Sequence, residues 1–491
     1  KFVLLIITVL RRKFFTNLTL LLFLNLLIKP FWIFGIDRTV QNVVGAEEYG
    51  LYFSLFNFSL LLNMLLDLGI TNYNNRNIAQ NNHLLSKSLS SIVSLRLLLA
   101  LLYTSVTIVA ALFVGYEGRQ FYLLIFLIFN QFLASFILYL RSNLSGLHYF
   151  KTDSIISVLD RFIMIVICGL LLWGGVTEKS FQIEWFIYAQ TAAYLFTLVV
   201  SFGIVYSKAQ FLKLKFDRTY FIAILKKSYP FALLSLLMAF YYRIDSVMLE
   251  RMLPDGKLQA GIYAHGFRIL DAAAMFAFLY ASLLLPMFSR MIKQKKSIHQ
   301  LTLFSFLLLI VPVVGITFAS YFYRTEIIDL LYHQHVDTSA TIFGILILCF
   351  LGISTSYIFG TLLTANGNLR KLNFMAVGGV IVNITLNFIF IPKYFALGSA
   401  IASLVTQTFV AILQVLLAKK IFKFSINLKQ IAIFVLFIVG VFLFSMFSVD
   451  LDFNWIYKFI AILVFTMILA FLLRLIHLKV LVDLLKNGDE I

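Results

Sequence analysis

Runs of about 20 apolar residues recur along the whole chain, and a helix of that length crosses the hydrocarbon core of a bilayer. No other feature restricts the fold as strongly. Hydrophobic residues occupy 61% of the 491 positions, Phe alone occurs 53 times, and only 13% of the residues are charged. A water-soluble globule of this length cannot bury so much apolar surface. The sequence therefore predicts an all-α integral membrane protein.

The apolar runs predict fourteen transmembrane helices. They cover residues 17–36, 46–70, 90–114, 120–144, 153–176, 183–206, 229–253, 259–289, 300–322, 341–364, 373–391, 396–418, 431–448 and 454–476.

A faint internal repeat divides these helices. Gly50-Leu51-Tyr52 and Gly261-Ile262-Tyr263 stand 211 residues apart, each opening a helix. Six helices fit in that interval, and an even number makes the two units parallel, related by an axis along the membrane normal. We expect two pseudo-symmetric six-helix lobes, residues 1–215 and 216–425, and then two C-terminal helices with a cytoplasmic tail in residues 426–491.

Basic residues indicate the orientation, because Lys and Arg in short loops are retained on the cytoplasmic side. With the N-terminus inside, inner segments carry 27 of the 40 Lys and Arg residues and outer segments carry 8. We expect both termini in the cytoplasm and no cleaved signal peptide. The net charge of +18 then lies beside anionic lipid head groups, so it implies no nucleic-acid partner.

Five cations fall inside the apolar runs: Lys29, Arg96, Arg161, Arg243 and Arg268. Each costs about 2.5–3.5 kcal/mol at the centre of an isolated spanning helix, so we expect them to face a wet or protein-lined interior. A rise of about 1.5 Å per residue puts Lys29, Arg243 and Arg268 at similar depth near the midplane. Three cations at one level suit a phosphate-bearing substrate, because Arg offers paired donors and Lys a mobile charge.

Arg96 and Arg161 lie nearer the cytoplasmic ends of their helices and are candidates for the inner mouth of the same cavity. Arg161 has alternative partners in Asp153 and Asp160, and either cation can instead snorkel to the inner head groups.

Neighbouring carboxylates leave a structural alternative open for the midplane cations as well. Asp271 follows Arg268 by three residues, which puts both on one helix face. Asp245 lies about 200° round the helix from Arg243 and is expected to meet another helix. Such pairs would fix helix packing instead of receiving a substrate, and Lys29 could snorkel.

Three further polar side chains are candidates for ion coupling. Asp67, which we place near the outer end of its helix, is either a proton or cation site or a polar cap. Asn383 and Asn387, one turn apart, could coordinate a cation or a sugar, although Asn in membranes commonly bonds to a neighbouring helix.

No catalytic, metal or cofactor motif stands out in the sequence. His333 and His335 have no further metal ligands close by, and Cys168 and Cys349 do not indicate a disulfide framework. P-loop, HExxH and GxSxG elements are missing. We therefore expect a transporter and not an enzyme. A glycan polymerase or ligase with residues on the outer face is the alternative from another class, and the short outer loops argue against it.

Several stretches together resemble one protein family. They are Tyr-Gly-Leu-Tyr at 49–52, Leu-Asp-Leu-Gly-Ile at 66–70, Tyr-Arg-Ile-Asp-Ser-Val-Met-Leu at 242–249, Asn-Ile-Thr-Leu-Asn-Phe-Ile-Phe-Ile-Pro at 383–392 and Gly-Ser-Ala-Ile-Ala at 398–402. In this order and spacing they resemble the Wzx-type polysaccharide flippases of the multidrug/oligosaccharidyl-lipid/polysaccharide (MOP) exporter superfamily. The resemblance covers nearly the whole chain and includes the fourteen-helix layout.

This resemblance implies translocation of an undecaprenyl-pyrophosphate-linked oligosaccharide, such as an O-antigen or capsule repeat unit, across the bacterial inner membrane. The expected partners are this lipid-linked glycan, membrane lipids, an H⁺ or Na⁺ gradient and glycan polymerases. The basic cavity would receive the pyrophosphate, and the lobes would then reorient. Two members of the same superfamily remain alternatives: a flippase for lipid II, the peptidoglycan precursor, and a MATE-like drug/cation antiporter, whose pocket should be acidic.

Overall fold

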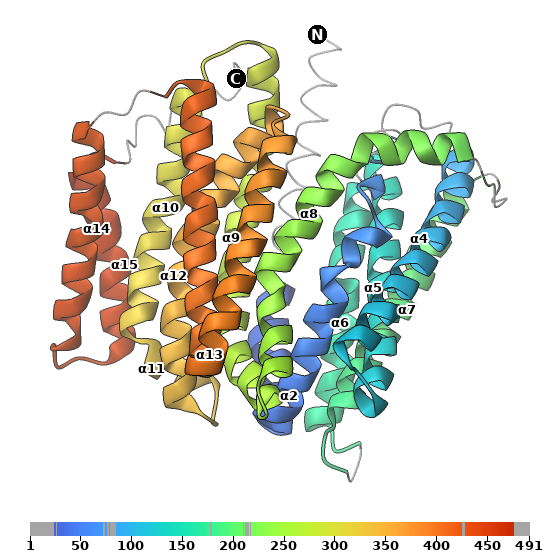
Figure 1. Cartoon of the computed structure of the whole chain (residues 1–491), viewed down its shortest axis with the longest axis horizontal. Coiled ribbons are helices and arrows are strands. Elements are labelled where there is room, and N and C mark those ends of the chain that lie inside the picture. Colours follow the sequence, from blue (N-terminus) through green and yellow to red (C-terminus); the bar gives the residue numbers. More distant parts are fainter. Residues whose placement is uncertain are drawn as a thin grey trace. The chain divides into compact units, whose positions relative to one another are not determined.

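A computed structural model describes residues 24–25, 27–71, 74–75, 78, 85–176, 179–209, 211, 216, 218–424 and 428–475. Within these residues every regular element is a helix, so the predicted all-α class is confirmed (Figure 1). The elements are η1 (Phe31–Asp37), α2 (Arg38–Leu61), η2 (Asn63–Leu66), α4 (Leu85–Val114), α5 (Gly118–Gly146), α6 (Phe150–Trp173), α7 (Ile183–Lys208), α8 (Arg218–Met252), α9 (Gly256–Lys293), α10 (His299–Phe322), α11 (Arg324–Leu331), α12 (Val336–Ala365), α13 (Leu369–Phe422), α14 (Leu428–Val449) and α15 (Trp455–Leu472).

The described helices are consistent with the predicted count of fourteen spans. Eleven of them are long and apolar enough to cross a membrane. One of the eleven, α13, covers two predicted spans, because Phe395 breaks the helix with φ 52° and ψ −134°. The first two predicted spans meet at Gly45, which breaks α2 with φ 82°. Residues 17–23 of the first span lie outside the described part of the chain.

The chain divides into two compact units, Lys1–Arg251 (unit 1) and Met252–Ile491 (unit 2). Unit 1 therefore contains α8, and unit 2 contains α9 to α15. The six-helix lobes expected from the internal repeat remain a prediction.

Unit 1 is held together by apolar packing among α4, α5, α6 and α7. The pairs α5–α7, α6–α7 and α2–α5 pack along their lengths. Ile92, Leu140, Ile156 and Tyr194 belong to one buried cluster that connects four helices. Side chains outside this cluster, on α4 and α7, remain apolar and exposed, as expected for surfaces that face lipid.

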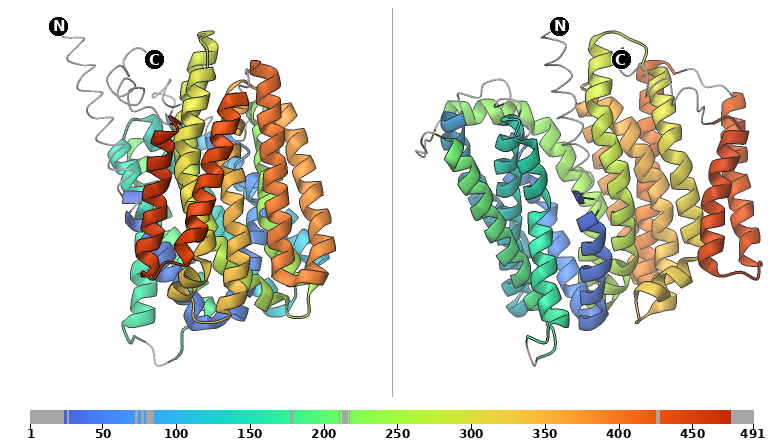
Figure 2. Two further views of the ribbon diagram at one scale, coloured as in Figure 1. Left: turned by 90° about the vertical axis from the view of Figure 1, so that its left-hand side faces the viewer. Right: turned by 180° about the vertical axis from the view of Figure 1, so that it is seen from behind.

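Unit 2 is built on close contacts of α12 with α9 and α13. Small residues allow them: a Cβ on Gly266 of α9 would lie 2.9 Å from the Cα of Phe343 on α12. A Cβ on Gly352 of α12 would lie 3.1 Å from the backbone of Gln407 on α13. Glycine at such positions lets membrane helices approach backbone to backbone. The helices α14 and α15 form a pair at the side of this unit and pack on α10 (Figure 2).

Candidate functional site

The helix at the start of the described chain is irregular where it carries Lys29. Pro30 follows Lys29 directly and cannot donate a backbone hydrogen bond. The next seven residues, Phe31–Asp37, form a π-helix, a rare element that often marks functional positions. This local geometry brings Lys29 and Trp32 toward α6 and α7, where their partners lie.

Arg161 of α6 lies close to two aromatic rings and to a second cation, Lys29. The guanidinium carbon of Arg161 lies 5.5 Å from the ring centroid of Trp32 and 5.8 Å from that of Tyr194. Its Nε lies 3.8 Å from Oδ2 of Asp160. Lys29 is within electrostatic range of both Arg161 and Asp160. We call Lys29, Trp32, Asp160, Arg161 and Tyr194 the cation–aromatic cluster.

The cation–aromatic cluster carries an excess of positive charge. Two cations face one carboxylate, and the side chain of Arg161 remains 29% exposed. Its Nη1 donates to the Met164 sulfur at 3.3 Å, and the guanidinium is also hydrogen-bonded to Tyr194. Because a sulfur atom is a weak acceptor, Nη1 of Arg161 can exchange this contact for a hydrogen bond to a phosphate oxygen with little loss of free energy.

Aromatic packing fixes the cluster from behind. Trp32 stacks on Phe186 with 5.6 Å between ring centroids and an interplanar angle of 1°. Tyr52 meets the edge of the same Phe186 ring at 5.1 Å and receives a hydrogen bond from Gln190 Nε2 at 2.7 Å. The orientation of Trp32, and through it of Arg161, is thereby preorganised by α2 and α7.

A buried carboxylate lies at the end of the π-helix. Asp37 is 2% exposed and accepts hydrogen bonds from Tyr49 Oη at 2.9 and 3.0 Å and from Gln41 Nε2 at 3.2 Å. Sequence reasoning missed Asp37 because it sits at the edge of an apolar run, where an acidic residue looks like part of a loop. Its burial makes it a second candidate for proton coupling in unit 1.

Arg243 of α8 forms a separate polar group with α2. Its Nη1 donates to Asn57 Oδ1 at 2.9 Å, and Asn57 Nδ2 donates to Ser246 Oγ at 2.9 Å. The guanidinium also lies 5.4 Å from the ring centroid of Tyr242. Asn57, which the sequence did not single out, therefore positions this cation. Asp245, next to this group in sequence, is 1% exposed.

Arg96 of α4 is buried in a polar network that occupies both of its terminal nitrogens. It is 2% exposed, forms an ion pair with Asp67, and donates to Thr71 Oγ1 and to the backbone oxygen and Oγ of Ser135. Its guanidinium lies 4.8 Å from the Tyr139 ring centroid. Both terminal nitrogens are occupied, while the buried Nε has no hydrogen-bond partner among the described residues. Full burial with an ion pair suits a structural role better than an open binding role.

Asp67 lies at the end of its helix that the topology assigns to the cytoplasm, and not near the outer end as predicted from the sequence. Asp67 follows the end of α2 opposite to Arg38, and it pairs with Arg96, so both lie at the end that the topology assigns to the cytoplasm. Asp67 also accepts the backbone N–H groups of Gly69 at 3.1 Å and Thr71 at 3.1 Å. It therefore caps the turn that follows α2, in addition to pairing with Arg96.

A charged group at the other end of unit 1 was also missed by sequence reasoning. Arg119 bridges Glu48 and Glu184, each at 2.7 Å. Nearby, Gln120 joins Glu250 and Arg251, by hydrogen bonds of 2.8 and 3.1 Å, and Arg251 lies 3.9 Å from the Tyr116 ring centroid. Burial and the neighbouring Glu250 raise the pKa of Tyr116, so this phenol stays neutral at physiological pH. The group ties together the ends of α2, α5, α7 and α8 that the topology assigns to the outer face.

Unit 2 has its own buried polar group, at the break in α13. Asn387 Nδ2 donates to the backbone oxygen and Oδ1 of Asn383, at 3.0 and 3.2 Å, and Ser399 Oγ donates to Asn387 Oδ1 at 2.8 Å. All three side chains are fully buried. Gly398 is required beside them, because a Cβ there would lie 2.4 Å from the Phe390 carbonyl oxygen.

The other residues singled out from the sequence lie on α9 and directly before α12. Arg268 and Asp271 are partly buried on one stretch of α9. His333 lies in the loop before α12, and His335 is the residue directly before the start of that helix. Within the described residues, no group of three or more His, Cys, Asp or Glu side chains is arranged to hold a metal ion. Of the five predicted cations, the structure brings Lys29 and Arg161 together, while Arg96 and Arg243 have separate partners. Pro30 inside an apolar run was the sequence signal for the irregular helix at Lys29.

Comparison with known proteins gives a family and a fold. Residues 17–292, more than half of the chain, match the family described as "Polysaccharide biosynthesis protein". No curated protein matches the sequence.

Solved structures show the same fold at low sequence identity. The lipid II flippase MurJ in an inward closed conformation matches with a TM-score of 0.67 and 15% identity, over 92% of this chain and 98% of MurJ. An inward-facing multidrug resistance MATE family transporter of the MOP superfamily matches with a TM-score of 0.62 and 14% identity, over 80% and 94%. A MOP superfamily transporter from Pyrococcus furiosus, described by the reverse polarity of its binding pocket, matches with a TM-score of 0.55 and 14% identity, over 83% and 93%.

Proposed function

Because this chain belongs to the polysaccharide biosynthesis protein family, we propose that it is a flippase that moves undecaprenyl-pyrophosphate-linked oligosaccharide units across a bacterial inner membrane. The observation that supports this substrate class most directly is the cation–aromatic cluster. Its two cations, held against one carboxylate in an apolar unit, favour an anionic head group, and aromatic faces suit sugar rings.

In this proposal the residues act by binding and not by covalent chemistry. Arg161 donates to pyrophosphate oxygens in place of the weak Met164 contact, and Lys29 adds a mobile point charge. Arg243 and Arg268 receive the head at the other helices, as the sequence predicts. The undecaprenyl tail stays in the bilayer while rigid-body reorientation exposes the head on the outer face.

Arg96 has a different place in this mechanism. Its partners Asp67, Thr71 and Ser135 occupy both of its terminal nitrogens, so it stabilises unit 1 near the predicted cytoplasmic end. In this proposal Arg96 belongs to the wall of the cavity near its inner mouth and does not bind the substrate.

Coupling to an H⁺ or Na⁺ gradient requires buried oxygen atoms that can bind and release the proton or cation. Asn383 and Asn387 with Ser399 offer such oxygens in unit 2, and Asp37 offers a titratable one in unit 1. Asp245 and Asp271 are further members of this proposed set. Glycan polymerases that receive the product are the expected protein partners.

Charge also separates this proposal from the two alternatives. A cationic drug would be repelled by Lys29 and Arg161, which disfavours a drug/cation antiporter despite the shared fold. Lipid II is an anionic lipid-linked saccharide, so a lipid II flippase remains the second candidate, favoured by the extent of the match to MurJ.

The test is an extraction of lipid-linked glycans from cells that lack this protein. Undecaprenyl-linked oligosaccharides should accumulate, and wild-type protein should clear them. Arg161→Gln should leave most of the intermediate uncleared, because the planar donor and its charge are lost. Arg161→Lys should clear it partly, because the charge remains.

Lys87→Gln is the matched control, since Lys87 is an exposed cation of unit 1 at the start of α4. It should behave as wild type. If the null strain accumulates lipid II instead, the peptidoglycan precursor is the substrate. If no lipid-linked saccharide accumulates, the proposed function is wrong.

A further inference from the structure

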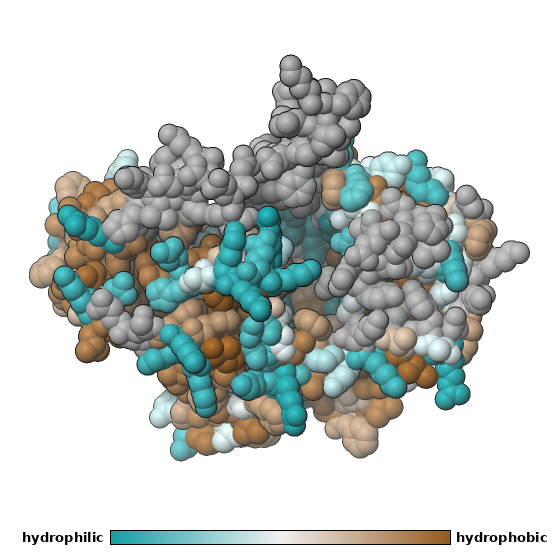
Figure 3. Space-filling model, turned by 90° about the horizontal axis from the view of Figure 1, so that it is seen from above, coloured by the Kyte–Doolittle hydropathy of each residue, from teal (hydrophilic) through white to brown (hydrophobic). Residues whose placement is uncertain are grey.

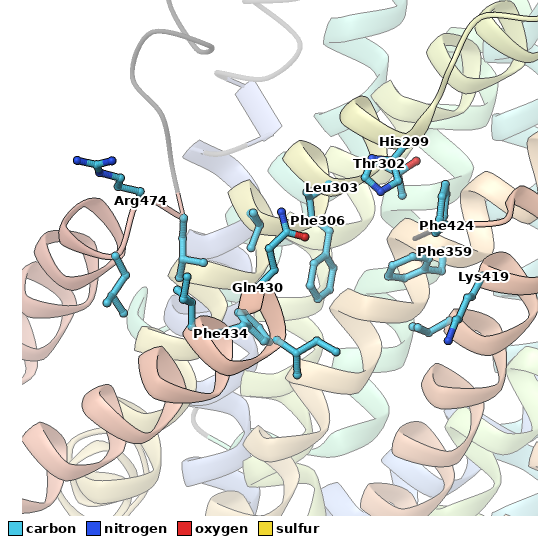
Figure 4. Close-up of a pocket in the computed structure, with 16 residues that line it drawn as sticks. His299, Thr302, Leu303, Phe306, Phe359, Lys419, Phe424, Gln430, Phe434 and Arg474 are labelled. Carbon is cyan, nitrogen blue, oxygen red and sulfur yellow. The ribbon is translucent and has the colours of Figure 1, made fainter. Parts of the chain in front are cut away.

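A pocket of about 370 Å³ lies within unit 2, where the pair α14 and α15 meets α10, α12 and α13. Its volume falls in the range of about 300–1,000 Å³ that small-molecule sites occupy. Three of the four Phe rings that line it lie next to one another: Phe306 lies 5.5 Å from Phe359 and 6.0 Å from Phe434, between ring centroids (Figure 4). These rings come from α10, α12 and α14, so the pocket joins the helix pair to the rest of the unit.

Polar side chains occur at the rim of this pocket, each at the end of a helix. His299 begins α10, Lys419 lies in the last turn of α13, Gln430 lies in the first turn of α14, and Arg474 follows the end of α15. Figure 4 shows His299 and Lys419 on one side of the aromatic rings and Arg474 on the other. None of the described lining residues is Asp or Glu. The rim is therefore basic and the interior apolar.

The rim lies at the membrane face that the topology assigns to the cytoplasm. Lys293, Lys295, Lys420 and Lys423 belong to the same helix ends and short loops. Figure 3 looks onto this face and shows hydrophilic side chains between hydrophobic ones. The apolar pocket thus opens where phosphate groups of the inner leaflet would lie.

A second hollow continues from the pocket along α12 and α13. It has a volume of about 410 Å³ and shares Val415 with the first. On α13 its lining includes Leu404, Thr408, Ile412 and Leu416, spaced by four residues, so they form one stripe. The stripe ends at Lys420 by the same spacing. From Lys420 to Leu404 it runs about 24 Å, more than the ~15 Å half-thickness of the hydrocarbon core.

We propose that the pocket and this groove together hold one anionic glycerophospholipid of the cytoplasmic leaflet. One acyl chain fills the aromatic pocket, the other lies in the groove, and the phosphate binds Lys419. Lys419 is one turn from Val415, the residue common to both hollows, so a two-chain lipid can straddle this point. The basic rim and the missing carboxylates favour a net negative head group over a zwitterionic one.

Such a lipid would stabilise the attachment of α14 and α15 to α10, α12 and α13. Its acyl chain would fill space between side chains that otherwise face each other across the pocket, and dispersion contacts are lost across an empty gap. This inference does not depend on which substrate is transported.

The experiment is native mass spectrometry of the full-length protein in detergent, titrated separately with phosphatidylglycerol, phosphatidylcholine and undecaprenyl phosphate. Phosphatidylglycerol should be retained in preference to phosphatidylcholine. Lys419→Gln should weaken its binding about tenfold, the effect of one lost charge-assisted contact. Thr408→Phe, at an exposed groove position, should also displace it without changing any charge.

Lys371→Gln is the matched control, because Lys371 is exposed on the same helix and at the same predicted membrane face but lines neither hollow. Size-exclusion profiles and thermal unfolding establish that each variant is folded. Equal weakening by Lys371→Gln would reduce the effect to general surface charge and overturn the site. Equal retention of phosphatidylcholine, or displacement of phosphatidylglycerol by undecaprenyl phosphate at equal concentration, would overturn it as well.

Discussion

The Arg96–Asp67 pair shows how far single charged residues could be interpreted from the sequence. Sequence reasoning identified both as charges that a membrane helix must accommodate, yet it assigned them to opposite ends of their helices. The two are 29 residues apart, and the intervening turn contains Leu68 at φ 45° and Gly69 at φ 81°. The predicted topology puts both residues at the cytoplasmic end, because the span 46–70 runs inward, so their proximity was predictable. The turn that aims Asp67 at Arg96 was not, because hydropathy does not report backbone conformation. The partner of Asn57 was not predictable either, because Arg243 is 186 residues away.

Replacement of Arg96 by Ala should destabilise the protein by about 3 kcal/mol, because removal of one member of a buried pair leaves the other uncompensated. Arg119→Ala is the comparison. Arg119 is 48% exposed, so loss of its ion pairs should cost less than about 1 kcal/mol. Thermal unfolding of purified protein in detergent measures both. Equal effects of the two substitutions would contradict the structural role of Arg96.

At the scale of elements, hydropathy predicted most helices closely. The run at 183–206 corresponds to Ile183–Lys208, and the run at 431–448 to Leu428–Val449. These boundaries are local, because they depend on where apolar residues stop. Pro30 signals an irregularity in the first helix, but the π form of Phe31–Asp37 and the continuation of α13 past Pro392 were not predictable, because they depend on contacts with other helices.

Gly266→Ala should destabilise unit 2 by about 1–3 kcal/mol, because the added methyl group forces α9 away from the backbone of α12. Gly203→Ala is a matched control in α7. A Cβ at Gly203 meets nothing within 4 Å, so alanine there should stabilise the helix by about 0.5–1 kcal/mol. The two unfolding midpoints should therefore shift in opposite directions. A rise for Gly266→Ala would show that the helices are not in close contact there.

At the scale of the whole molecule, the distribution of Lys and Arg predicts an orientation in the membrane, which the helix bundle alone does not. Helices of either orientation would bury the same apolar surface, but only one orientation retains most Lys and Arg residues in the cytoplasm. The family match and the shared transporter fold agree with a multi-pass membrane protein. The polarity of the bundle across the membrane is still a prediction.

Cysteine labelling tests this orientation. Cys168 and Cys349 are both buried, so the background should be low. A membrane-impermeant maleimide added to intact spheroplasts should label Asp452→Cys, in the loop between α14 and α15. Gln294→Cys, exposed after α9, should react only once the membrane is permeabilised. The reverse pattern would place the termini outside.

The π-helix at Phe31–Asp37 has one consequence for how a helix can act as a switch. Each residue added to a helix turns everything beyond it by about 100°. A π-turn holds one surplus residue, and that surplus can pass along the chain as successive hydrogen bonds exchange partners. If it moved one turn toward the N-terminus, past Lys29, that cation would turn by about 100° and shift in depth by only about 1.5 Å, while Asp37 stayed in place. The direction in which Lys29 points would then depend on the register of the helix that carries it.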